Sequence, residues 1–72
     1  MYLNLMNEMR KNHITVDNIA TLLGLHRNSI RSRNNGAIPY TVDEAFLVKS
    51  RFFPYADIEW LFRNYNENAG QS

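Results

Sequence analysis

The sequence predicts an all-α fold, a compact bundle of about five short helices. Three observations favour this fold class. Apolar residues recur at helical spacing along most of the chain, no stretch sustains the alternation of a β-strand, and capping or helix-ending residues separate the apolar stripes. The length of 72 residues suffices for one small domain. We place that domain at residues 1–65 and expect a polar, frayed tail at residues 66–72.

The first two predicted helices are defined by their apolar faces and their end signals. The first face has the i, i+3, i+4, i+7 spacing of a helix and consists of Tyr2, Leu5, Met6 and Met9. That helix ends near Asn12 and His13. The second helix has Thr15 as its N-cap and Gly24 as the residue that ends it. Its apolar face consists of Val16, Ile19, Ala20 and Leu23.

Three further helices are predicted. The third covers residues 26–35, directs Ile30 inward and is ended by Gly36, after which Ile38 and Pro39 disfavour a restart. The fourth begins at a capping box, Thr41-Val42-Asp43-Glu44. It is expected to carry Val42, Ala45 and Phe46 inward and to end at Phe52, Phe53 and Pro54. The fifth runs from about Asp57 to Tyr65 with an apolar face of Ile58, Leu61, Phe62 and Tyr65.

Composition argues against several kinds of site. The chain has no cysteine, which excludes disulfides, thiolate zinc sites and a cysteine nucleophile. His13 and His26 lack partners at ligand spacing, and the three glycines form no phosphate-binding loop. We therefore expect no enzymatic activity, no metal and no cofactor. No apolar run approaches the ~18 residues that span a bilayer, so we expect a cytoplasmic protein without membrane contact.

The charge is unevenly distributed along the chain. The net charge is +1, but residues 24–36 contain Arg27, Arg31 and Arg33 and no acid, which gives this segment +3. Residues 41–67 contain five acids and three bases, which gives −2. A locally basic segment favours binding to a polyanion, although a solvated helix face would carry the same charges.

The second and third predicted helices together carry the most specific pattern. The residues concerned are Ile19, Ala20, Leu23, Gly24, Leu25 and Ile30. Ala20 is small where two helices would cross, Gly24 accepts a left-handed turn conformation, and Leu25 and Ile30 fill the angle between the helices. The spacing therefore predicts a helix-turn-helix at about residues 16–35.

The chain resembles the small phage repressors and Cro proteins, which are helix-turn-helix regulators of the lambda-repressor type. Residues 14–36 carry the resemblance, and the segment Ser29-Ile30-Arg31-Ser32-Arg33-Asn34-Asn35-Gly36 is similar to the end of that family's recognition helix. Two positions depart from the family. Val16 stands where a glutamine usually holds a phosphate, and Arg33 stands where an apolar core residue is usual.

The resemblance implies base-reading side chains at Arg27, Asn28 and Ser32 and a phosphate contact at Asn35. Helical geometry agrees, because at ~100° per residue these residues and Arg31 fall within an arc of about 140° that faces away from Ile30. His26 precedes them as a cap or a phosphate donor. The candidate DNA-binding face is His26, Arg27, Asn28, Arg31, Ser32 and Asn35.

The expected function is that of a phage or prophage transcriptional regulator that binds double-stranded operator DNA as a homodimer in its bacterial host. Two alternatives remain open: an antirepressor, or modulator of repression, that binds the cognate phage repressor, and a purely structural helical module. Part of an aromatic cluster is a candidate interface, because it exceeds what one small core can hide. The cluster consists of Phe52, Phe53, Tyr55, Trp60, Phe62 and Tyr65.

Overall fold

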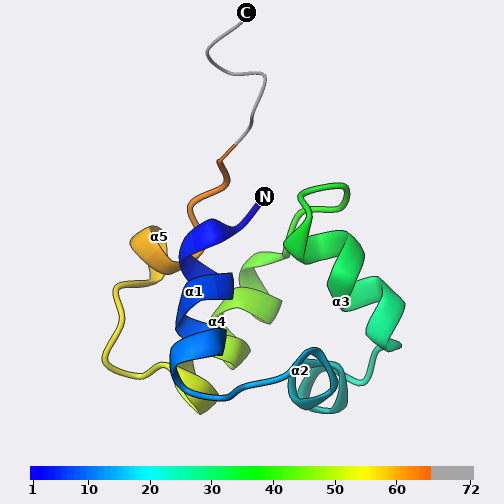
Figure 1. The fold of residues 1–72 in the computed structure, drawn as a ribbon, viewed down its shortest axis with the longest axis horizontal. Helices are drawn as coiled ribbons and strands as arrows, with labels where there is room; N and C mark the ends of the chain where they lie inside the picture. Colours follow the sequence, from blue (N-terminus) through cyan, green and yellow to red (C-terminus); the bar gives the residue numbers. More distant parts are fainter. Residues whose placement is uncertain (66–72) are drawn as a thin grey trace, which may run out of the picture.

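Five α-helices make up the regular structure of residues 1–65, which is the part of the chain that this computed structural model describes (Figure 1). They are α1 (Leu3–Lys11), α2 (Val16–Leu23), α3 (Arg27–Asn34), α4 (Val42–Phe52) and α5 (Ile58–Leu61). No strand occurs in this range, so the prediction of an all-α fold with five short helices is confirmed. The tail predicted at residues 66–72 lies outside the described residues.

The predicted helix starts and stops are confirmed where capping chemistry defined them. Thr15 caps α2 through a capping box with Asn18, and Thr41 caps α4 through a capping box with Glu44. Gly24 ends α2 with a φ of 68°, a left-handed conformation that glycine adopts without a steric penalty. The His26 side chain also acts as a cap, because its Nδ1 accepts a hydrogen bond of 3.1 Å from the Asn28 N–H.

Each helix contributes one completely buried side chain to a single core. These residues are Leu5, Ile19, Ile30, Val48 and Leu61, and Phe53 joins them directly after α4. Full burial of one such side chain stabilises the fold by roughly 1.5–3 kcal/mol relative to leaving it exposed. α2 packs against α3 and α4, whereas α1 and α4 both contact α5. As a result, α3 and α5 lie on opposite sides of α1 and α4 (Figure 1).

Tyr2 and Tyr40 connect the beginning of the chain to the end of α3. The Tyr2 N–H donates to the Asn34 carbonyl at 3.0 Å, and the Tyr2 hydroxyl accepts from the Tyr40 N–H at 3.1 Å. The Tyr40 hydroxyl donates to Asn34 Oδ1 at 2.6 Å, and its burial raises the pKa of Tyr40. The two rings and that of Phe62 form edge-to-face pairs with centroids 5.1–6.1 Å apart. Buried polar groups are thus satisfied within an aromatic cluster.

The prediction that Val42 and Phe46 point inward is wrong. Their side chains are 70% and 53% exposed, although Ala45 is buried as expected. α4 turns the face that carries Ala45 and Val48 toward the core, and Val42 and Phe46 lie at the margin of that face. Ile58 and Glu59 of α5 lie beside the two side chains without burying them.

The fifth helix is also shorter than predicted. It covers Ile58–Leu61 rather than about residues 57–65, although Asp57 caps it by accepting from the Trp60 N–H at 2.9 Å. The chain leaves the helix at Phe62, which packs against Tyr2 and Tyr40. The Tyr65 N–H then donates to the Met1 carbonyl at 2.8 Å. If the helix continued to Tyr65, this N–H would instead donate within the helix.

Replacing Ile30 with Asp should unfold the domain, because it would bury an unpaired charge at a position with no solvent exposure. Ala20→Leu should cost about 1–3 kcal/mol, because Ala20 is buried in α2 and a larger side chain would overpack the core there. Thermal melts followed by circular dichroism measure both effects. Thr21→Leu, at the exposed neighbouring position, is the matched control and should melt like the parent chain. Cooperative melting of Ile30→Asp at the parental temperature would contradict the observed docking of α3.

Candidate nucleic-acid interface

α2 and α3 are joined by a short turn that packs them against each other. After Gly24, the Leu25 N–H donates back to the Ala20 carbonyl at 3.0 Å, and α3 begins two residues later. Among the predicted motif residues, Ile19, Ala20 and Ile30 are buried, and Leu23 and Leu25 are partly buried against the same core. An alanine Cβ at Gly24 would meet no atom within 4 Å, so the need for glycine there comes from its left-handed backbone.

The structure brings the candidate DNA-binding residues together on one side of α3. His26, Arg27, Asn28, Arg31 and Asn35 are exposed, and Ser32 is half-buried. The opposite side carries the buried residues Ile30 and Asn34. α3 contains no acidic residue and lies at the edge of the molecule (Figure 1).

The chemistry of this face suits a duplex. Arginine can bond to two acceptors of guanine, asparagine can bond to adenine, and serine or asparagine can bond to phosphates or base edges. A helix of eight residues is about 12 Å long, and the major groove admits an α-helix. The exposed side of α3 therefore combines the functional groups and the dimensions that direct readout requires.

Asp17 is a neighbour of this face that the sequence analysis missed. Its Oδ2 lies 3.1 Å from Arg27 Nη2, and both side chains are more than half exposed. The N-cap at Thr15 places Asp17 in the first turn of α2, and the turn after Gly24 folds that end of α2 toward the start of α3. Exposed ion pairs contribute about 0–1 kcal/mol, so Arg27 can exchange Asp17 for another anion at low cost.

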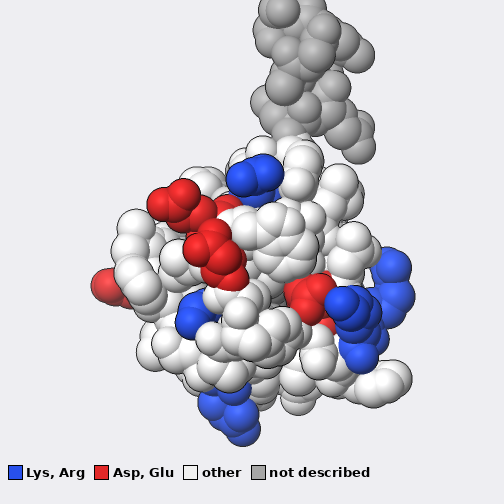
Figure 2. Space-filling model, turned by 90° about the vertical axis from the view of Figure 1, so that its left-hand side faces the viewer, with Lys and Arg blue, Asp and Glu red and all other residues white. Residues whose placement is uncertain are grey.

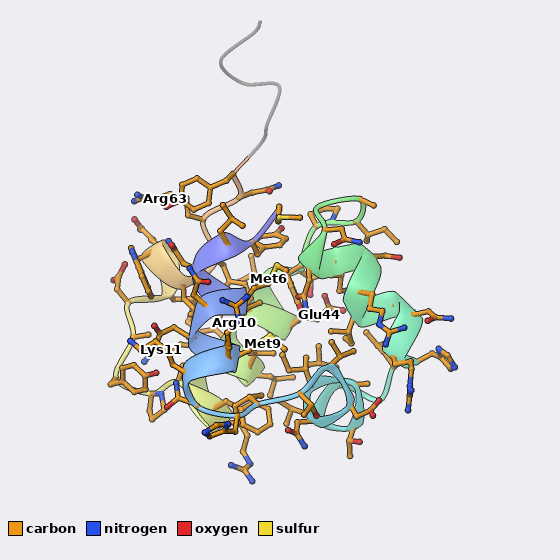
Figure 3. The ribbon with its side chains drawn as sticks, in the orientation of Figure 1. Met6, Met9, Arg10, Lys11, Glu44 and Arg63 are labelled. Atoms are coloured by element: carbon orange, nitrogen blue, oxygen red, sulfur yellow. The ribbon has the colours of Figure 1, made fainter. Side chains whose placement is uncertain are left out.

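Arg33 does not belong to the exposed basic face. Its Nε and Nη2 donate to the two carboxylate oxygens of Glu44 at 2.9 and 3.1 Å, and its Nη1 donates to the Ser29 carbonyl at 3.2 Å. Figure 3 shows Glu44 in the space between α4 and α3. The two side chains are only 13% and 18% exposed. Arg33 therefore links α3 to α4 through Glu44, at the position where the phage repressors and Cro proteins that the chain resembles have an apolar residue.

Most of the basic side chains outside α3 lie away from the α3 face. Arg31 is the arginine of α3 without an ion pair inside residues 1–65. Arg10, Lys11 and Arg63 lie on the side of α1 and α5, away from α3 (Figure 3). Val16 is half-buried and packs against the core, so the position that offers an amide in the resembling family is used here for packing. The candidate face thus carries two arginines, one of them paired.

The aromatic cluster is divided by the structure. Phe53 directly follows α4 and is completely buried in the core. Its assignment to a candidate interface is therefore wrong. Phe52 and Phe62 are half-buried, whereas Tyr55, Trp60 and Tyr65 are exposed. The Tyr55 hydroxyl donates to Glu8 at 2.5 Å, and this bond lowers the pKa of Glu8. The exposed part of the cluster therefore reduces to Tyr55, Trp60 and Tyr65.

Within residues 1–65, no three histidine, aspartate or glutamate side chains are grouped so that they could hold a metal ion. The helices of the same range are all too short or too polar to cross a bilayer. Comparison of the chain with protein-family models, curated proteins and solved structures found no match. What the protein does is therefore inferred from its own residues.

Glu44→Gln should destabilise the domain at pH 7 by roughly 1–2 kcal/mol. This free energy lies between those for breaking an exposed and a buried ion pair, because both side chains of the pair are only partly exposed. The hydrogen bonds from Arg33 lower the pKa of Glu44 below its ordinary 4.5, so the stabilisation is present above that pH and is lost as the pH falls through the folded-state value. The difference in melting temperature between the parent chain and the variant should therefore narrow below about pH 4.5. Glu59→Gln, at an exposed position without an ion pair in residues 1–65, is the control. A difference that stayed constant with pH would contradict the role of this ion pair.

Proposed function

We propose that the chain is a phage or prophage transcriptional regulator that binds operator DNA through the exposed side of α3 in the cytoplasm of a bacterial host. The observation that carries the proposal is the division of α3 into two sides. Ile30, Arg33 and Asn34 anchor the helix, and the acid-free opposite side presents Arg27, Asn28 and Arg31 to the surroundings. The turn at Gly24 and the buried residues of α2 support a helix-turn-helix.

A single α3 makes too few contacts for tight binding. Specific affinity for an operator commonly requires two copies on half-sites about one helical turn apart. Trp60 is 38% exposed on α5, a helix outside the candidate DNA-binding face. Exposed tryptophan is enriched in protein interfaces, and we therefore propose a homodimer in which this side chain lies at the contact.

A second candidate function is that of an antirepressor that docks on the cognate phage repressor. The charge pattern favours it. Arg33 is neutralised by Glu44, Arg27 is paired with Asp17, and Val16 provides no phosphate ligand. With a net charge of +1, the long-range attraction to DNA is weak. A gel shift with the DNA upstream of the coding sequence, with and without the neighbouring repressor, separates the two functions.

Arg27→Ala and Arg31→Ala should weaken specific DNA binding while leaving the thermal melt nearly unchanged, because both side chains are exposed. Loss of a base-reading arginine should cost about 1–3 kcal/mol on the cognate site, and loss of a phosphate contact should reduce the salt slope by about one unit. Titrations at several salt concentrations measure both quantities. Arg10→Ala, on the exposed side of α1, removes the same charge away from α3 and should bind DNA like the parent chain.

Unchanged DNA affinity in both variants would refute the assignment of α3 as the recognition helix. The antirepressor function predicts a different set of results. The parent chain would bind DNA weakly and with strong salt dependence, would co-elute with the repressor, and would lose that complex on Arg27→Glu.

Trp60→Ala should shift the protein toward the monomer in sedimentation and reduce operator affinity, because dimer formation and DNA binding are linked. The main chain of Trp60 makes the structural bonds of α5: its N–H donates to Asp57 and its carbonyl accepts from Asn4. Truncating the side chain leaves those bonds in place. Leu47→Ala, at an exposed position of α4, is the control. A parent chain that is monomeric and binds its operator specifically would rule out the proposed dimer.

A further inference from the structure

We infer that the groove between α4 and α5 is a docking site for a basic amphipathic helix of a partner protein. The groove has a volume of about 440 Å³, and its apolar wall is formed by Tyr2, Tyr40, Val42, Phe46, Ile58 and Phe62. Its residues come from the first half of α4, from α5 and from the chain around them, and none belongs to α3. The inference therefore goes beyond the proposed binding of DNA.

The exposed apolar side chains of the groove call for a covering partner. Val42 and Phe46 are spaced i, i+4 on α4, which places both on the same side of the helix. They are 70% and 53% exposed although Ile58 and Glu59 of α5 line the same groove. An amphipathic helix that lies in such a groove buries apolar side chains at matching i, i+3 and i+4 positions.

Most of the charges around the groove are acidic. Glu59 lines it, and two further acids are next in sequence to lining residues: Asp43 follows Val42, and Asp57 precedes Ile58. One base, Arg63, follows the lining residue Phe62. These three carboxylates form no ion pair within residues 1–65, and no lysine or arginine is among the lining residues. Figure 2, which views the side of the molecule where α5 lies, shows several acidic side chains close together, with basic side chains beside them. An apolar groove with an acidic border complements an apolar stripe flanked by lysine or arginine.

The same charges argue against a second copy of this chain as the occupant. A two-fold contact through the groove would place the same surface patch of both subunits face to face. Asp43, Asp57 and Glu59 would then meet their own counterparts, and like charges brought together in an interface are destabilising. The chain's own last residues, 66–72, contain Glu67 and no base, so they do not supply the required charge either.

The test uses the isotope-labelled full chain and a synthetic helical peptide of roughly four turns, with leucine on one side and lysine elsewhere. A matched peptide carries glutamate in place of lysine. We expect the lysine peptide to shift the amide resonances of Val42, Phe46 and Ile58 in a saturable way, and the glutamate peptide to bind at least about tenfold more weakly. Phe46→Ser should weaken binding of the lysine peptide about tenfold or more.

Two further variants sharpen the result. Glu59→Gln should weaken binding about threefold at low salt and less at high salt, because the attraction is electrostatic. Leu47→Ser removes an equally exposed apolar side chain, at 51%, that does not line the groove, and it should leave binding unchanged. Folding of each variant is checked by its amide spectrum.

Three outcomes would overturn the inference. They are the absence of saturable shifts at the groove, equal binding of the lysine and glutamate peptides, and an equal loss of binding in Leu47→Ser and Phe46→Ser. Concentration-dependent shifts of the groove residues without any peptide would assign the groove to a second copy of the chain instead.

Discussion

The structure depends on how α3 is held, because this helix has almost no apolar surface of its own. Its eight residues include one apolar side chain, Ile30, and an isolated helix of this length is not stable in water. The other two anchors are polar: Arg33 pairs with Glu44, and Asn34 accepts from the Tyr40 hydroxyl. Ile30, Arg33 and Asn34 are spaced i, i+3, i+4, so they form one side of the helix and leave the other side free for a ligand.

The capping signals and the core were the features most accessible to prediction from the sequence. Thr15, Gly24 and Thr41 act through bonds to residues within a few positions, so local sequence defines their roles. The errors arose where distant elements decide the outcome. Val42 and Phe46 are exposed because packing turns the side of α4 with Ala45 and Val48 toward the core. The fifth helix ends at Leu61, and Phe62 and Tyr65 then contact the beginning of the chain. No local pattern contains that information.

For the candidate site, the exposed side of α3 could be predicted from the sequence, but the ion-pair partners of its arginines could not. Helical periodicity sufficed to place Arg27, Asn28, Arg31 and Asn35 on one exposed side of α3, because the position of Ile30 defines the opposite side. Periodicity could not identify their partners. Asp17 reaches Arg27 from ten positions away and Glu44 reaches Arg33 from eleven, so the charge of +3 counted along the segment overstates the free charge on the surface.

The first turn of α4 links the two surfaces of the molecule. The capping box of Thr41 and Glu44 fixes this turn, and the same Glu44 carboxylate that accepts from the Thr41 N–H also receives the Arg33 guanidinium. Val42 and Asp43 lie between these two residues and belong to the wall and border of the groove. A partner that displaced this turn would move the carboxylate that anchors α3. A partner that moved Tyr2 or Tyr40 in the groove wall would disturb their hydrogen bonds to Asn34 of α3. Occupation of the groove would therefore affect the proposed DNA binding if it moved Glu44, Tyr2 or Tyr40, because these residues hold Arg33 and Asn34 of α3.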